Sequence, residues 1–137
     1  MITLTLSHQI DFESIERVVF GYEQIELGED AKQAVSESAN FIRERAQSGN
    51  AIYGVTTGFG ANRDQVIRPE DAEVMQERLL MSHACGVGAP LPEHVVRAMM
   101  LLRISALSKG NSGIRLRTLE LLIEMLNRHV HPIVPEM

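Results

Sequence analysis

The chain has one cysteine and no tryptophan, and aromatic residues make up only 4% of its 137 positions. A single cysteine, Cys85, cannot form an internal disulfide. The sequence also lacks the paired Cys/His pattern of a structural zinc site. Thirteen Lys and Arg residues against 18 Asp and Glu give a net charge of −5, which provides no basic surface for nucleic acid or an anionic membrane. We therefore expect neither a metal nor a nucleic-acid partner.

Long apolar runs are also missing. The most apolar stretch, residues 95–107, is interrupted by Arg97 and Arg103, and the N-terminus lacks the basic start and apolar block of a signal peptide. The length corresponds to a single domain. These features predict one cytoplasmic domain, residues 1–137, without a membrane partner.

Hydrophobic spacing predicts an all-α, mostly helical chain. Residues 2–6 alternate in the period of one short strand, and Asp11 is placed to cap a first short helix. Apolar residues three and four positions apart predict longer helices, over about 29–47, 69–86, 92–109 and 112–131. Asn111 or Ser112 is expected to cap the last of these helices.

The expected helix over 92–109 has little polar surface. An apolar helix of this kind needs cover on most sides, and a 137-residue monomer offers few partners. We expect other polypeptide to cover it, either a C-terminal part or neighbouring subunits.

Residues 51–64 hold three glycines within seven positions and show neither helical nor sustained strand periodicity, so a structured loop is expected. Thr56 and Thr57 favour extended backbone, whereas the glycines permit positive φ or close approach. Such a conflict is typical of functional sites. The local alternative is a tight turn with a buried Tyr53, and a phenol serves as a base only if its pKa falls from about 10.

The other candidate side chains have plain structural interpretations. His83 lies on the apolar face of its expected helix, where a hydrogen-bonded core histidine is the more common outcome. The pair His129 and His131 lacks a third metal ligand nearby. Cys85 has no patterned base, which favours a buried, unreactive thiol.

Four segments together resemble a known family. Tyr53-Gly-Val-Thr-Thr-Gly-Phe-Gly60 resembles the tyrosine loop of the aromatic amino acid ammonia-lyases and aminomutases, and residues 76–88 (QERLLMSHACGVG) resemble their substrate-selectivity helix. Residues 107–115 (LSKGNSGIR) are similar to the turn and helix that follow, and residues 131–135 (HPIVP) to the approach to the cofactor loop. The order and spacing match across about 50–137. The resemblance implies the N-terminal part of a mostly helical homotetramer whose active sites draw residues from three subunits.

The same resemblance implies a chemistry. The family's electrophile is 4-methylideneimidazole-5-one, formed from an internal Ala-Ser-Gly, and the reaction removes a β-proton and ammonia from an L-amino acid. Tyr53 would be the base. The residues implied to position its loop are Gly54, Thr57, Gly58, Phe59 and Gly60. No Ala-Ser-Gly occurs in the 137 residues, so we expect this polypeptide to be inactive without the remaining C-terminal part or a second chain that carries it.

Substrate choice is implied by two consecutive residues, Ser82 and His83, which resemble the pair found in histidine-specific members. The implied reaction converts L-histidine to trans-urocanate, with Ser82 and His83 contacting substrate and His83 holding its imidazole. A phenylalanine or tyrosine lyase, or a 2,3-aminomutase, shares the loop chemistry. A truncated, non-catalytic helical interaction subunit is the alternative from another functional class.

Overall fold

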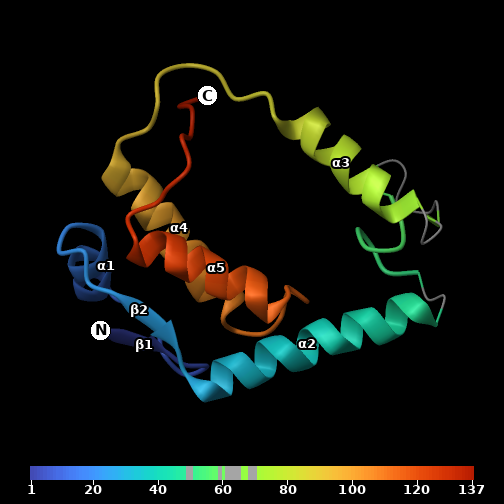
Figure 1. The fold of residues 1–137 in the computed structure, drawn as a ribbon, viewed down its shortest axis with the longest axis horizontal. Helices are drawn as coiled ribbons and strands as arrows, with labels where there is room; N and C mark the ends of the chain where they lie inside the picture. The colour runs from blue at the N-terminus through green and yellow to red at the C-terminus, as the bar shows by residue number, and fades with distance from the viewer. Residues whose placement is uncertain (49–50, 59, 61–65, 68–70) are drawn as a thin grey trace. The chain divides into compact units, whose positions relative to one another are not determined.

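The computed structural model describes residues 1–48, 51–58, 60, 66–67 and 71–137 (Figure 1). In chain order the elements are β1 (Ile2–Leu4), α1 (Phe12–Val19), β2 (Ile25–Leu27), α2 (Glu29–Gln47), α3 (Ala72–His83), α4 (Glu93–Leu107) and α5 (Leu116–Asn127). They form two compact units, one of Met1–Asn40 with Val87–Met137 and one of Phe41–Gly86. Within the described part of the chain, no helix has the length and apolar character needed to cross a membrane. The expected mostly helical fold is confirmed.

A small parallel sheet corrects the all-α expectation. β1 pairs with β2 in the register Ile2 with Ile25, Thr3 with Glu26 and Leu4 with Leu27. The apolar side chains of both strands face the core, whereas the Thr3 hydroxyl donates to the Glu26 carboxylate at 2.8 Å. Because each strand is only three residues long, β2 carries no periodic signal that the sequence could display.

The free edge of β2 is occupied by a side chain from α5. The backbone N–H of Ile25 donates to Asn127 Oδ1 at 2.9 Å, and Asn127 Nδ2 donates to the Ile25 carbonyl at 2.8 Å. One amide group therefore satisfies both backbone groups of Ile25, as a neighbouring strand would. This contact ties the end of α5 to the sheet.

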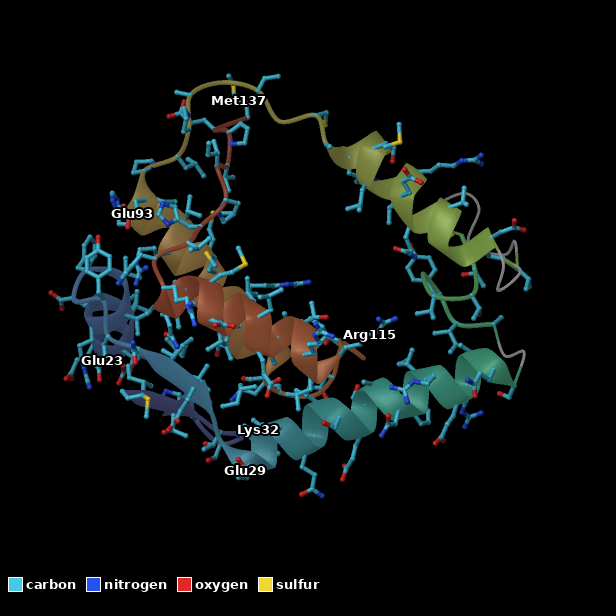
Figure 2. All side chains as sticks on the ribbon, in the orientation of Figure 1. Glu23, Glu29, Lys32, Glu93, Arg115 and Met137 are labelled. Atoms are coloured by element: carbon cyan, nitrogen blue, oxygen red, sulfur yellow. The ribbon has the colours of Figure 1, made fainter. Side chains whose placement is uncertain are left out.

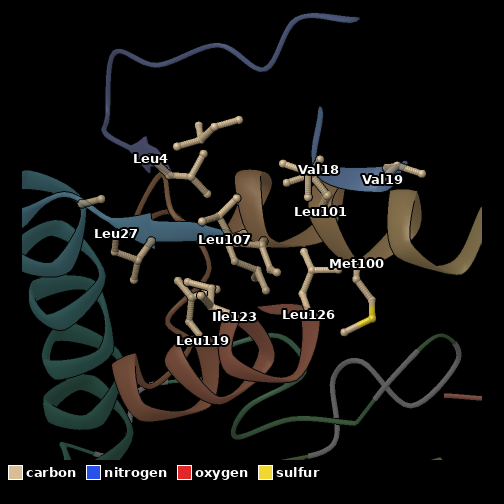
Figure 3. Packing of buried hydrophobic residues seen from close by; sticks show 14 of the residues in the cluster. Leu4, Val18, Val19, Leu27, Met100, Leu101, Leu107, Leu119, Ile123 and Leu126 are labelled. Carbon is tan, nitrogen blue, oxygen red and sulfur yellow. The ribbon is translucent and has the colours of Figure 1, made fainter. Parts of the chain in front are cut away.

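The core of the larger unit lies between α4, α5, α1 and the two strands (Figure 3). Leu101 and Ile104 on α4 and Leu119 on α5 are completely buried, and α4 packs against both α1 and α5. Met99 and Leu102 stay about half exposed, at 47% and 51%. Helices α1 and α5 therefore cover one face of α4, and the expected cover by other polypeptide concerns the face that carries Met99 and Leu102.

Arg97 is 2% exposed and lies inside this core. Its guanidinium donates to the carbonyls of Val18 at 2.8 Å, Val19 at 3.2 Å and Leu126 at 3.2 Å. These carbonyls belong to the last turns of α1 and α5, where helix carbonyls lack partners and where positive charge is favoured. The arginine thus joins two helix ends from the middle of a third helix.

Two helix starts differ in how well the sequence indicated them. Asp11 caps α1 as expected and accepts the Ser14 N–H at 2.8 Å. Hydrogen bonding from the Ser14 side chain, and then from this backbone N–H, lowers the pKa of Asp11. The last helix starts later than expected, at Leu116 with Arg115 at its N-cap, so neither Asn111 nor Ser112 caps it. Ser112 Oγ instead accepts the Ile114 N–H at 3.3 Å.

The turn before α5 packs closely on α2, which explains the late start. Gly110 has a φ of +72°, and a Cβ at this position would lie 2.8 Å from the Ala34 backbone. Gly113, also at φ +72°, donates its N–H to Ser38 Oγ at 3.0 Å. The chain therefore follows the surface of α2 through residues 110–113 before it turns into α5.

Ion pairs lie on the surface of the larger unit, and Figure 2 labels three of the residues that form them, Glu23, Glu29 and Lys32. Glu23 accepts from Arg17 Nε at 2.7 Å and Nη2 at 2.8 Å, and from the N-terminal ammonium at 2.7 Å. Hydrogen bonds from Arg17 and then from the ammonium lower the pKa of Glu23 to about 2. Lys32 and Glu29 pair one turn apart on α2, at 2.6 Å.

Candidate active site

The candidate site lies in the smaller unit, Phe41–Gly86, on α3 and the loop before it. The helix expected over 69–86 is observed from Ala72 to His83, and Pro69 lies outside the described residues. Its described side chains are intermediate or exposed, so the expected apolar stripe does not form a core here. The helix instead presents these side chains at a surface.

The described part of the loop is a closed turn. The Ile52 carbonyl accepts the N–H groups of Val55 at 3.0 Å and Thr56 at 2.9 Å, and the Thr56 hydroxyl accepts the Ile52 N–H at 2.7 Å. Gly54 has a φ of +73° inside this turn, a conformation that glycine adopts without strain. The reciprocal bonds between Ile52 and Thr56 hold Tyr53 at the tip.

Thr57 continues the loop as extended backbone, as its β-branched side chain favours. It pairs in an antiparallel bridge with Val66, and the neighbouring Thr56 carbonyl accepts the Ile67 N–H at 2.8 Å. Thr57 is 4% exposed, and its hydroxyl donates to the Gly58 carbonyl at 3.3 Å. Thr57 and Gly58 thus form the inner side of the loop, whereas Phe59 and residues 61–64 lie outside the described residues.

Tyr53 is 64% exposed, so the interpretation as a buried tyrosine was wrong. The Gly60 N–H donates to the Tyr53 phenol oxygen at 3.5 Å, a long hydrogen bond. Gly60 has a φ of +56°, and among the described residues no atom lies within 4 Å of the position where a Cβ would be. The phenol is therefore held at a surface with open space beside Gly60.

His83 is also exposed, which corrects the interpretation as a core histidine. Its Nδ1 lies 2.9 Å from the Leu79 carbonyl oxygen and 3.0 Å from Ser82 Oγ. Ser82 Oγ itself donates to the same Leu79 carbonyl at 2.8 Å. The predicted pair is thus bonded at the end of α3, through Nδ1 of the imidazole.

Tyr53 and His83 line one pocket of about 630 Å³, together with Gly60, Leu79 and Leu80. Ser82 is not among the described residues that line it, since its hydroxyl is turned to the Leu79 carbonyl. Leu80, 71% exposed, was not singled out from the sequence. Its position three residues before His83, which places both on neighbouring parts of a helix surface, is the signal that could have identified it.

The remaining candidate side chains lie elsewhere. The described residues contain no group of three or more His, Cys, Asp or Glu side chains that could hold a metal ion. His129 packs edge-on against Tyr22, with ring centroids 4.8 Å apart. Cys85 is exposed rather than buried, because the backbone after His83 leaves the helix and residues 84–90 all lie at the surface.

The sequence of the chain is similar to those of known enzymes. The model of the family described as aromatic amino acid lyase matches residues 10–137. A protein named histidine ammonia-lyase from Alkaliphilus oremlandii (strain OhILAs) is 50% identical over 128 residues, covering 93% of this chain and 25% of that protein. A histidine ammonia-lyase from Natranaerobius thermophilus is 47% identical over 135 residues, covering 98% of this chain and 26% of that protein.

Solved structures agree. The phenylalanine aminomutase of Pantoea agglomerans superposes with a TM-score of 0.93 at 28% identity, covering 100% of this chain and 27% of that one. The histidine ammonia-lyase of Trypanosoma cruzi superposes with a TM-score of 0.87, also at 28% identity, covering 100% of this chain and 26% of that one. The fold is therefore that of ammonia-lyases and aminomutases.

The chain belongs to the aromatic amino acid lyase family, whose model covers most of its length. It spans about a quarter of the length of the curated relatives it matches.

Proposed function

We propose that this chain is the N-terminal part of a histidine ammonia-lyase, which eliminates ammonia from L-histidine to give trans-urocanate. The observation that carries the proposal is the pocket that Tyr53 and His83 line together. A β-elimination needs a base at the β-carbon, and discrimination of histidine needs a polar partner for its ring. In this pocket Tyr53 supplies the base and His83 supplies the polar partner.

In this proposal Tyr53 takes the β-proton onto its phenol oxygen, and His83 hydrogen-bonds the substrate imidazole. Leu79 and Leu80 pack beside the substrate side chain. The loop turn built by Ile52 and Thr56 positions the phenol, with Gly54, Thr57, Gly58, Phe59 and Gly60 as the loop residues that permit its path. Bound substrate would bury His83, and phenylalanine would leave the polar ring nitrogen of His83 unpaired, so the pocket should reject phenylalanine.

The space around the loop is compatible with the family's cofactor. The open space beside Gly60 leaves room for a bulky group to approach the loop. When bound, 4-methylideneimidazole-5-one supplies the electrophile that activates the amino group for departure. The 137 residues contain no Ala-Ser-Gly, so in this proposal the cofactor comes from the remaining part of the lyase, in a cytoplasmic homotetramer or a split hetero-oligomer. The chain alone is then inactive.

The experiment is a chimaera in which residues 1–137 replace the matching segment of the Alkaliphilus oremlandii relative. We expect urocanate, detected by its ultraviolet absorbance, from L-histidine and a much lower rate with L-phenylalanine. The unmodified relative is the control. A second chimaera in the Natranaerobius thermophilus relative covers the case in which the first does not fold.

Other products would contradict the proposal in distinct ways. Faster deamination of phenylalanine or tyrosine would assign one of the sibling lyases, and a β-amino acid product would assign a 2,3-aminomutase. A folded chimaera of the native size that converts none of these amino acids would support the non-catalytic interaction subunit.

A further inference from the structure

Three polar atoms meet at the C-terminal turn of α3. The Leu79 carbonyl oxygen lies 2.9 Å from His83 Nδ1 and 2.8 Å from Ser82 Oγ, and the last two atoms lie 3.0 Å apart. All three distances are within hydrogen-bond range, so the protons must be distributed among them consistently.

The carbonyl decides the distribution, because a carbonyl oxygen can only accept. The Ser82 hydroxyl donates its one hydrogen to the Leu79 carbonyl. His83 Nδ1 lies 2.9 Å from the same oxygen, and because that oxygen only accepts, Nδ1 carries a hydrogen as well. The reverse assignment would place the lone pair of Nδ1 against a carbonyl lone pair at 2.9 Å. With Nδ1 protonated, its hydrogen meets two acceptors, the Leu79 carbonyl and a lone pair of Ser82 Oγ.

We propose that Ser82 is a positioning residue that, together with the Leu79 carbonyl, holds neutral His83 as the Nδ1–H tautomer and so makes Nε2 a hydrogen-bond acceptor in the pocket. An acceptor there selects a substrate ring that carries an N–H. The preference for a substrate ring with an N–H rests on the proposed function, whereas the tautomer is a property of the chain itself. Ser82 then acts on substrate choice through His83 and without touching the substrate.

The tautomer is measured on the 137-residue chain by long-range proton–nitrogen NMR of histidine-labelled protein at about pH 8.5, well above the ordinary histidine pKa of about 6.5. His83→Gln identifies the His83 signals among those of the five histidines. We expect Nδ1–H in the wild type, although an unconstrained histidine favours Nε2–H. Ser82→Ala should raise the Nε2–H fraction. Ser82→Thr keeps the hydroxyl and should return the Nδ1–H fraction to the wild-type value.

A matched control separates this effect from general loss of helix capping. Ser48 at the end of α2 donates to the Arg45 carbonyl at 2.9 Å, the same three-residue pattern without a histidine beside it. Ser48→Ala should leave the His83 tautomer unchanged. Predominant Nε2–H in the wild type, or a ratio that Ser82→Ala does not alter, would overturn the proposal.

Methylated substrates test the acceptor role in the active chimaera. A neutral imidazole methylated on either nitrogen has no ring N–H, so both methyl-histidine isomers should bind much more weakly than histidine. If His83 Nε2 carried a hydrogen and donated it, the methyl-histidine isomer whose unmethylated ring nitrogen faces Nε2 would still bind. Binding of that isomer as tight as that of histidine would show that the acceptor role is wrong.

The Ser82→Ala chimaera should raise KM for L-histidine about threefold to tenfold with little change in kcat, because one hydrogen bond that orients His83 is lost. Ser82→Thr should return KM toward the wild-type value. An unchanged KM would show that Ser82 does not position His83 for binding. A folded chimaera of the native size without urocanate production would refute the proposed function, while the NMR result would still decide the tautomer.

Discussion

The guanidinium of Arg97 lies over the ring of Tyr22, with its Cζ 4.4 Å from the ring centroid. A cation over an aromatic face is attracted by the ring, and burial strengthens this attraction. The N–H groups of Arg97 donate to three helix-end carbonyls, and the Tyr22 ring covers one face of the same guanidinium.

Arg97→Met should therefore destabilise the fold by about 2–4 kcal/mol, because three carbonyls lose a buried donor. Urea unfolding followed by circular dichroism measures the change. Arg103→Met is the matched control, since Arg103 is exposed on the same helix and its loss should cost less than about 0.5 kcal/mol. Equal effects of the two substitutions would contradict the structural role of Arg97.

Gly110→Ala should destabilise the larger unit by about 2 kcal/mol or more, because the new Cβ adds a clash to left-handed backbone strain. The Cβ would lie 2.8 Å from backbone atoms of Ala34, which cannot move without shifting α2. Gly60→Ala isolates the strain, since Gly60 has a φ of +56° and open space around it, and it should cost about 1 kcal/mol. Thermal unfolding of both variants makes the comparison, and a larger cost at Gly60 would refute the packing argument.

Glu23 should make stability depend on pH in the acid range. Its folded pKa of about 2 lies below the ordinary 4.5, so its contribution is present above about pH 4.5 and is lost as the pH falls toward 2. The difference in urea midpoint between the wild type and Glu23→Gln should be largest near pH 6 and shrink through this window. Added salt should reduce it, because the ion pairs are partly exposed. A difference that grows on acidification would contradict the assignment.

Tyr53→Phe in the active chimaera should lower kcat by about 10²- to 10⁴-fold with little effect on KM, because the proton acceptor is lost while the ring remains. Tyr22→Phe removes the hydroxyl of the only other tyrosine, which lies in the larger unit and donates to Glu93 at 3.3 Å. It should leave kcat within about twofold of the parent. Steady-state urocanate formation measures both, and a fully active Tyr53→Phe variant would remove Tyr53 as the base.

The sequence predicted those parts of the fold that depend on neighbouring residues. The helix over 29–47 was predicted with its observed bounds because Ala31 and Val35, one turn apart, form its buried side. Asp11 was identified as a cap because its acceptor serves a backbone N–H three residues later. Both signals are local, and tertiary contacts do not override them.

Features that depend on distant residues could not be predicted. Strand β2 pairs with β1 and is bonded at Ile25 by an amide 102 positions away. Arg97 was interpreted as an interruption, although it bonds carbonyls 78 and 79 residues earlier. At the candidate site the helical period placed Leu79 and His83 on one face, but it predicted burial. None of the described side chains of α3 is buried, and the same face lines an open pocket.

The amide of Asn127 has a consequence for how the chain behaves in solution. An uncovered strand edge offers unpaired backbone groups to any extended peptide, and such edges begin aggregation. Ile25, at the start of β2, already has both its N–H and its carbonyl engaged by one side chain that is itself anchored at the end of a helix. The amide therefore blocks the addition of another strand at Ile25. A hydrophobic residue of the same size could not do so, because it would leave the N–H and carbonyl of Ile25 unpaired.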